Sequence, residues 1–332
     1  MLTGSSMARN LGFACAAAVL LGGCGGGGTT PAPSPTALIL EFPLPTASAL
    51  PNHIVKGPDG NLWFTENGVN KIGKIDLGGT VTEYAGLTPG AKPLGIAAGP
   101  DGNVWFTENG TNLIGSITPT GTVTEYSGLT AGAAPIGIAL GSDGNLWFAE
   151  TGINKIGKIT PTGTVTEYGT LASGAQPVGI VAGPDAGVLW FTEYGANKIG
   201  RMTTGGVLTG EFTLPTAAAQ PYYIATGTDG NLWFTEKQGN KIGKITTGGA
   251  FIAEYPLPTS SAYPIAITQG SGGEIWFTEY GISRIGKITT AGKVTEYPVT
   301  TSAAGLWGIT EGADAYIWFT EYGVNKIGKI AQ

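Results

Sequence analysis

His53 is the only histidine in this 332-residue chain, and it is the side chain best suited to acid–base chemistry. An imidazole can act as a general base or a metal ligand near neutral pH, so His53 is our candidate catalytic residue. Other catalytic and metal-binding arrangements are excluded, because the sequence lacks the residues that they need. The sequence has no Gly-x-Ser-x-Gly elbow, and one histidine excludes a multi-histidine metal cluster. A three-arginine sialidase site is also excluded, because only Arg201 and Arg284 follow the N-terminal region.

A glutamate ends each of seven copies of the phrase Trp-Phe-Thr/Ala-Glu. The copies are Glu66, Glu108, Glu150, Glu193, Glu236, Glu279 and Glu321. In six copies a four-residue turn leads to a basic residue: Lys71, Lys155, Lys198, Lys241, Arg284 and Lys326. Residues that flank such a hairpin loop face each other, so we predict six cross-strand ion pairs with a structural role. Glu108 is the exception, because Leu113 replaces the basic residue and Ser116 stands where other copies carry Lys or Arg.

Aspartates recur in a Pro/Ser-Asp-Gly-Asn turn or a close variant of it. They are Asp59, Asp101, Asp143, Asp185 and Asp229. Asp and Gly are the residues that hairpin turns prefer, whereas calcium needs more oxygen ligands than one turn offers. We therefore predict that these aspartates build turns.

The elements that position these residues follow from the repeat itself. The copies begin at Trp63, Trp105, Trp147, Trp190, Trp233, Trp276 and Trp318, a step of 42 or 43 residues. Each period holds four short β-branched or aromatic runs separated by Gly, Pro, Asn and Asp, which is typical of four strands joined by tight turns. Four strands per period of this size predict an all-β fold, a seven-bladed β-propeller with four antiparallel strands per blade. The last unit lacks its fourth strand, and Ile39–Pro45 matches the missing piece. We expect this N-terminal strand to complete the last blade and close the ring.

Positions where the blades differ are the candidate binding residues. The starts of the innermost strands should surround one mouth of the central channel. There the units carry mostly small and aliphatic residues, but Asn52, His53, Tyr222, Tyr223 and Trp307 break this pattern. Aromatic rings with polar tips can line a small-ligand site, so we predict ligand binding by these five residues. Packing at a wide channel mouth is the alternative.

The N-terminal region has the composition of a targeting segment. Residues 1–23 combine one basic residue with a short apolar run, which is typical of a secretory signal and too short for a membrane span. The ending Leu-Gly-Gly-Cys resembles a bacterial lipobox, which implies cleavage before Cys24 and lipidation of that cysteine. Residues 24–37 then form a Gly/Pro-rich tether, and residues 38–331 form the propeller. We expect a lipoprotein anchored in the cell envelope, in the outer membrane if the cell is Gram-negative, with membrane contact through the lipid only.

The repeated unit Gly-Pro-Asp-Gly-Asn-Leu-Trp-Phe-Thr-Glu, continued by Asn-Lys-Ile-Gly-Lys-Ile and Thr-Val-Thr-Glu-Tyr, is seen from Gly57 to Tyr84. It closely resembles the virginiamycin B lyase (streptogramin lyase) family, and the likeness covers residues 39–330. The resemblance implies a seven-bladed propeller that linearises cyclic depsipeptide antibiotics by elimination at the ester linkage. It also implies Mg²⁺ as cofactor and a histidine base at one channel mouth.

The motifs that carry this activity in the family are not matched here. The Pro-His-Gly-Ile motif of the final blade corresponds to Leu306–Ile309, so Trp307 replaces the histidine and Gly305 replaces a glutamate. A second Pro-His-Ala-Ile motif corresponds to residues 264–267, which read Pro-Ile-Ala-Ile. A metal-side glutamate falls at Tyr322, next to Glu321. The resemblance therefore implies that the base and the metal anchors of the family are missing.

Three functions remain open. The leading hypothesis is an envelope propeller that binds a small molecule or an envelope protein and does not catalyse the family reaction. The second is a divergent, Mg²⁺-dependent carbon–oxygen lyase with His53 as base and Glu311 or Glu321 near the metal. The third is a structural or adhesive envelope protein.

The formal charge is −6, and without a basic stripe we expect no nucleic-acid partner.

Overall fold

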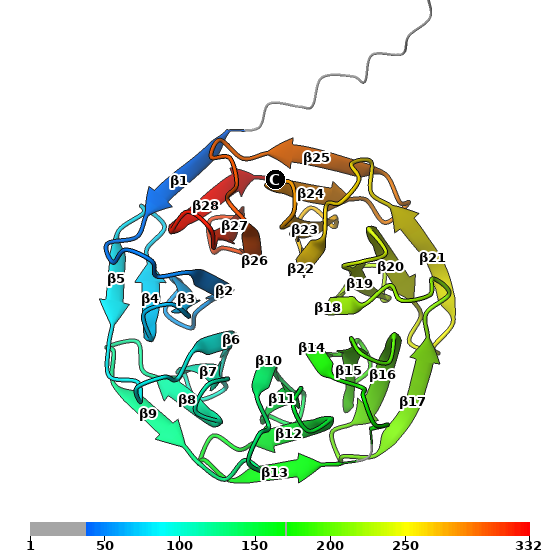
Figure 1. Cartoon of the computed structure of the whole chain (residues 1–332), viewed down its shortest axis with the longest axis horizontal. Helices are drawn as coiled ribbons and strands as arrows, with labels where there is room; N and C mark the ends of the chain where they lie inside the picture. The colour runs from blue at the N-terminus through cyan, green and yellow to red at the C-terminus, as the bar shows by residue number, and fades with distance from the viewer. Residues whose placement is uncertain (1–37, 170) are drawn as a thin grey trace, which may run out of the picture. The chain divides into compact units, whose positions relative to one another are not determined.

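Seven four-stranded antiparallel sheets stand in a ring (Figure 1), which confirms the predicted propeller. The computed structural model describes residues 38–169 and 171–332. Regular structure in these residues is all strand, and none of them forms a helix long and apolar enough to cross a membrane. The predicted leader, the tether and the lipidation site Cys24 lie outside the described residues.

Each blade is a meander of four strands numbered along the chain. The innermost strands are β2 (Pro51–Lys56), β6 (Pro93–Ala98), β10 (Pro135–Leu140), β14 (Pro177–Ala182), β18 (Pro221–Thr226), β22 (Pro264–Gln269) and β26 (Leu306–Glu311). The second strands are β3 (Leu62–Glu66), β7 (Val104–Glu108), β11 (Leu146–Glu150), β15 (Val188–Glu193), β19 (Leu232–Glu236), β23 (Ile275–Glu279) and β27 (Tyr316–Glu321). The third strands are β4 (Lys71–Ile75), β8 (Leu113–Ile117), β12 (Lys155–Ile159), β16 (Lys198–Thr203), β20 (Lys241–Ile245), β24 (Arg284–Ile288) and β28 (Lys326–Ala331). The outer strands are β5 (Val81–Tyr84), β9 (Val123–Tyr126), β13 (Val165–Tyr168), β17 (Leu208–Thr213), β21 (Phe251–Pro256), β25 (Val294–Pro298) and β1 (Ile39–Pro43).

The second strands form the core of every blade because both of their faces are covered by neighbours. Every residue of β3 is buried, and the Trp and Phe of each copy are among the largest fully buried side chains. In β3 the ring of Phe64 lies over Gly73 of β4, where a Cβ atom would overlap it. The Trp-Phe pairs therefore act as packing residues that join adjacent blades.

The predicted closure of the ring is confirmed. β1 pairs with β28 in antiparallel register from Ile39 opposite Ile330 to Pro43 opposite Lys326. The ring of Phe42 stacks on Trp318 of the last blade, with ring centroids 5.7 Å apart. The two ends of the described chain thus share one sheet, and no blade is left incomplete.

The repeated aspartates act in turns, as predicted. Asp59 accepts hydrogen bonds from the backbone nitrogen of Asn61 at 3.2 Å and from the Trp63 indole nitrogen at 2.9 Å. Gly60 in the same turn has a φ of 79°, which suits glycine. The same indole bond forms at Asp101, Asp143 and Asp229, whereas the indole nitrogen of Trp190, in the blade of Asp185, has no partner among the described residues.

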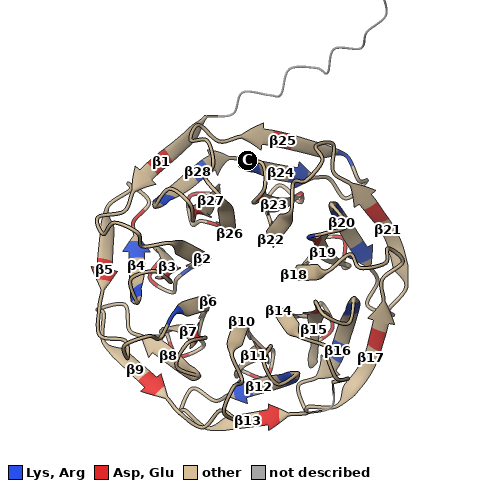
Figure 2. Cartoon of the chain, in the orientation of Figure 1, with Lys and Arg blue, Asp and Glu red and all other residues tan. Residues whose placement is uncertain are grey.

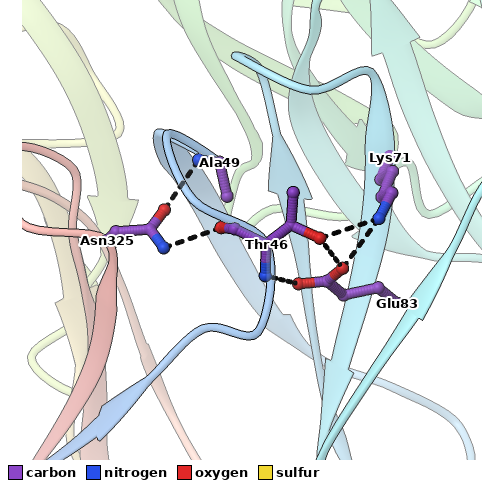
Figure 3. A network of polar contacts seen from close by, with 5 residues as sticks. All are labelled: Thr46, Ala49, Lys71, Glu83 and Asn325. Carbon is purple, nitrogen blue, oxygen red and sulfur yellow. Dashed lines mark hydrogen bonds and ion pairs between the residues drawn. The ribbon is translucent and has the colours of Figure 1, made fainter.

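The six predicted ion pairs of the repeated glutamates do not form, although their strand register is as expected. Lys71 lies directly opposite Glu66, but its Nζ contacts Oε2 of Glu83 on the outer strand at 2.8 Å (Figure 3). Glu83 also accepts hydrogen bonds from the backbone nitrogen of Thr46 at 2.9 Å and from its hydroxyl. The ammonium group remains partly exposed at the periphery, whereas Glu66 is fully buried. Figure 2 shows the acidic residues on the outer strands and the basic residues on the third strands.

Burial determines the charge of the inner glutamates. Burial, with the nearby Glu83 carboxylate as the second cause, raises the pKa of Glu66 to about 8, while Lys71 opposes the shift. Neither carboxyl oxygen of Glu66 has a hydrogen-bond partner in the described structure. Glu108, which lacks a basic partner, instead accepts a hydrogen bond from Thr111 at 2.6 Å. The inner glutamates are therefore protonated near neutral pH and belong to the blade core.

Candidate functional site

The mouth residues sit on β-bulges at the starts of the innermost strands. In β2 the pairing jumps from Pro51 to Ile54, which leaves Asn52 and His53 on the bulge. Every innermost strand has the same irregularity. A bulge redirects side chains out of the ladder, and here it directs them to the channel mouth.

A threonine of each Trp-Phe-Thr-Glu phrase holds these bulges in place. Thr320 accepts a hydrogen bond from the backbone nitrogen of Gly308 at 2.8 Å and donates one to the carbonyl of Asn52 at 2.6 Å. Thr235 does the same between Tyr223 and the carbonyl of Ile265, at 3.0 and 2.8 Å. The repeat thereby fixes the position of each mouth residue relative to the next blade.

His53 and Tyr223 meet across the channel, and together they form what we call the plug. Their strands, β2 and β18, lie on different sides of the ring (Figure 1). The two rings stand edge to face with centroids 4.6 Å apart, and the Tyr223 hydroxyl lies 3.3 Å from His53 Nδ1. Gly308 makes room for the β2 backbone, because a Cβ there would lie 2.8 Å from the Cα of His53.

The plug is electrically neutral. Burial lowers the pKa of His53 to about 3, although the Leu94 carbonyl opposes the shift. Burial also raises the pKa of Tyr223 well above its ordinary value. His53 is 8% exposed, and its Nε2 has no hydrogen-bond partner among the described residues. The imidazole is therefore uncharged over the physiological range.

Five further aromatic side chains gather above the plug, and we call them the aromatic mouth: Tyr194, Tyr222, Tyr280, Trp307 and Tyr322. Tyr222 contacts Tyr223 of the plug at 5.5 Å and Trp307 at 6.2 Å between ring centroids. Tyr280 and Tyr322 flank Trp307 at 5.6 and 5.5 Å. Tyr194 meets the edge of Tyr222 at 5.7 Å. The rings come from blades four to seven, so one side of the mouth is aromatic.

The structure thus brings together four of the five predicted ligand-binding residues: His53, Tyr222, Tyr223 and Trp307. Asn52 lies on the same bulge as His53; it is buried, and its Oδ1 has no partner in the described structure. Sequence reasoning missed Tyr194 and Tyr280 as mouth residues, and it noticed Tyr322 only through the family resemblance. All three directly follow a repeated glutamate. That position is Asn, Asn and Thr in the first three blades, and the change to Tyr, Lys, Tyr and Tyr was the available signal.

Below the plug the channel is lined by isoleucines. A cavity of about 110 Å³ touches the plug together with Ile54, Ile96 and Ile138. A larger cavity of about 520 Å³ continues along the innermost strands to Thr226, Gln269 and Leu140 at their far ends. The plug therefore separates the aromatic mouth from an apolar channel.

The predicted metal residues do not come together. Glu321 is fully buried at the end of β27, where it pairs with Leu306, the first residue of β26. Glu311 is the last residue of β26, and it accepts a hydrogen bond from Gln332 at 2.9 Å. The two carboxyl groups thus lie at opposite ends of one hairpin. In the described residues no three His, Cys, Asp or Glu side chains converge. Proteins usually hold Mg²⁺ by one or two carboxylates together with waters, and neither the plug nor the aromatic mouth supplies a carboxylate, so these residues do not fit a Mg²⁺ site.

Fold and site define a seven-bladed propeller with a plugged channel and an aromatic mouth. Residues 34–209 and 168–332 match the model of the virginiamycin B lyase family, and the chain belongs to this family. A streptogramin B lyase structure is 43% identical with a TM-score of 0.83, and the match covers 88% of this chain and 97% of that chain.

Two further structures come from Staphylococcus aureus. Virginiamycin B lyase of that organism is 42% identical with a TM-score of 0.84, over 89% of this chain and 99% of that chain. A catalytically inactive histidine-to-alanine variant of it, solved with quinupristin, is 41% identical with the same TM-score and coverage. A search of curated proteins gave no match.

Proposed function

We propose that this protein binds a small ligand with an extended apolar or aromatic surface at the aromatic mouth, and that it does not catalyse ring-opening elimination. The observation that carries the proposal is the continuous set of edge contacts from Tyr194 through Tyr222 and Trp307 to Tyr280. Aromatic rings with polar tips provide large contact areas at small entropic cost, which suits ligand recognition.

The chemistry of the plug supports binding over catalysis. A general base works best when its pKa lies near the working pH. His53 has a pKa of about 3, so it is a weak base at pH 7, and its Nδ1 already faces the Tyr223 hydroxyl. The plug and the aromatic mouth also supply no carboxylate that could hold Mg²⁺.

The place of action is part of the proposal. The Leu-Gly-Gly-Cys sequence before residue 25 supports lipidation at Cys24 and an envelope location. Radiolabelled palmitate incorporation into the wild-type protein, and its loss in Cys24→Ala, is the expected result. Labelling that persists in the variant would contradict the anchor.

A second candidate function is a divergent carbon–oxygen lyase. The observations that favour it are the 43% identity to a streptogramin B lyase and the unpartnered Nε2 of the plug histidine. This candidate requires that His53→Ala lose turnover and still fold.

One experiment separates these functions. The protein is incubated with a type B streptogramin, with and without Mg²⁺, and binding is measured by calorimetry and products by mass spectrometry. We expect binding, an intact antibiotic, and loss of binding in Trp307→Ala and Tyr222→Ala with unchanged circular dichroism. A new product of unchanged mass would mean ring opening and would contradict our proposal. Equal binding by both variants would remove the site assignment and favour a structural or adhesive role on another surface.

A further inference from the structure

The loops around the aromatic mouth contain no acidic residue. Two sets of loops meet on this face: those that precede the innermost strands and those that follow the repeated glutamates. Among the described residues of these loops the only charged side chains are Lys92 and Lys237. Lys92 belongs to the second blade, where the mouth is aliphatic, whereas Lys237 belongs to the fifth blade, beside Tyr222.

Lys237 occupies the repeat position that directly follows a glutamate. In the first and third blades the residue at this position has a structural role, because the side chains of Asn67 and Thr151 donate hydrogen bonds to backbone carbonyls of the next blade. The Lys237 ammonium makes no hydrogen bond or ion pair to any described residue. Its Nζ lies 5.0 Å from the centroid of the Tyr222 ring, and the side chain is partly buried. Its ammonium group is therefore held at the aromatic mouth without a structural bond of its own.

The two glutamates of the same blade, Glu236 and Glu254, do not neutralise the charge of Lys237. Burial raises the pKa of Glu236 to about 8, so this group is mostly protonated at pH 7. Glu254 contacts Lys241 at 3.0 Å and accepts a hydrogen bond from the hydroxyl of Thr216 at 2.5 Å. Burial also lowers the pKa of Lys237, as expected for an ammonium group that is partly shielded from water.

We infer that Lys237 is the anion-recognising residue of the aromatic mouth, and that the ligand is an apolar or aromatic molecule carrying a carboxylate or phosphate group. This inference rests on the proposed binding function and specifies its ligand class. The rings would cover the apolar body of the ligand, while the ammonium group would pair with its anion in a partly desolvated position. A cationic ligand would meet Lys237 without any compensating carboxylate in the surrounding loops.

Calorimetry with three matched probes tests the assignment: 2-naphthoate, 2-naphthyl phosphate and the neutral 2-naphthamide. We expect at least one anionic probe to bind about fivefold or more tightly than the amide, with an affinity that falls as salt rises. Lys237→Gln should remove this preference and leave amide binding unchanged, and Lys237→Arg should retain it. Lys92→Gln is the matched control from the same face and should bind like wild type. Trp307 supplies the location, because the other seven tryptophans are fully buried and its indole N–H signal should shift alone.

The outcomes separate this inference from the proposed function. Equal binding of anionic and neutral probes, with the Trp307 signal shifted, would overturn the role of Lys237 and leave the binding site standing. A preference for anions that survives Lys237→Gln but disappears in Lys92→Gln would also overturn it. If no probe binds, both proposals fail for this class of ligand. Comparison of the carboxylate and phosphate probes shows which anion the site prefers.

Discussion

At the scale of single residues, burial decides the chemistry of every titratable group that attracted attention in the sequence. The inner glutamates lie next to outer glutamates, and in six of the seven blades it is the outer one that forms the ion pair with the third strand. Burial raises the pKa of Glu150 to about 8, with the Glu167 carboxylate as the second cause. Burial opposes ionisation of Glu41 as well, but hydrogen bonds from Lys326, Thr300 and Thr301 outweigh it and lower its pKa to about 2. In the first, third, fifth and last blades an inner glutamate with a raised pKa thus lies beside an outer glutamate with a lowered pKa.

This division predicts how stability depends on pH. Between pH 4.5 and about 8 the inner carboxyls hold protons that the unfolded chain has released, so the free energy of unfolding should fall as pH rises through this window. Below pH 4.5 the outer carboxylates, whose pKa values are lowered in the fold, lose their contribution as the pH falls toward about 2. We expect maximal stability near pH 4.5, measured by urea unfolding across the pH range. A stability maximum near pH 8 would contradict this account.

Glu150→Gln tests a single inner group. The amide resembles the protonated acid in shape and does not titrate, so the variant should lose less stability than wild type between pH 5 and 8. The difference in slope should be up to about 1.4 kcal/mol per pH unit. Glu311→Gln, which removes a carboxyl group at the far end of β26, serves as the control for the same chemical change outside the blade core. Identical slopes for all three proteins would show that Glu150 is already ionised.

At the scale of secondary-structure elements, the bulge and its threonine connect packing to the site. The bulges direct His53 and Tyr223 into the channel, and threonines such as Thr320 tie one blade to the bulge of the next. Ala149 replaces this threonine in the third blade, where the mouth carries only aliphatic residues and glycine. Thr107 makes the same two bonds, at 2.9 and 2.7 Å, between Gly95 and Ile136 at the aliphatic side of the mouth, so the bond does not depend on large mouth side chains.

Thr320→Val should disturb the plug through the backbone. The substitution keeps the shape but leaves the Asn52 carbonyl and the Gly308 nitrogen without their buried partner, at a cost of about 1–3 kcal/mol. Urea unfolding should report this loss, and NMR should show a changed environment for the His53 ring. Thr82→Val, on the exposed side of an outer strand, should change stability by about 0.5 kcal/mol or less. An unchanged stability of Thr320→Val would show that the two hydrogen bonds of Thr320 do not stabilise the bulge.

At the scale of the whole molecule, closure of the ring depends on a short strand from the start of the described chain. β1 is held by its ladder with β28, by the stacking of Phe42 on Trp318, and by the ion pair of Glu41 with Lys326 at 2.8 Å. In a closed ring each blade supports its neighbours, so opening this joint exposes the edge of β28.

Phe42→Ala should weaken the closure by about 2 kcal/mol or more, because it removes a stacked ring from a packed joint. Hydrogen exchange should accelerate first in β1 and β28 and later in the other blades. Leu40→Ala on the same strand is the control, since Leu40 is 40% exposed. Uniform acceleration in every blade would argue against local opening at the joint.

The fold could be predicted because it repeats. Seven copies of one phrase specify the strand order, the blade count and the closure, since each blade must bury the same Trp-Phe faces against its neighbours. The same regularity located the mouth, because residues that break the repeat at one register position had to gather around one end of the channel. Tyr222, Tyr223, Trp307 and His53 were found in this way.

Contacts that depend on side-chain depth or on distances across the ring could not be predicted, because no repeat period encodes either quantity. Local hairpin geometry correctly placed Lys71 opposite Glu66, but the depth of each side chain decided that the lysine contacts Glu83. In the same way, only the width of the channel determines that His53 reaches Tyr223 of a distant blade. His53 is buried there, and its burial keeps the imidazole neutral. Register follows from sequence pattern, whereas burial and charge state follow from the assembled ring.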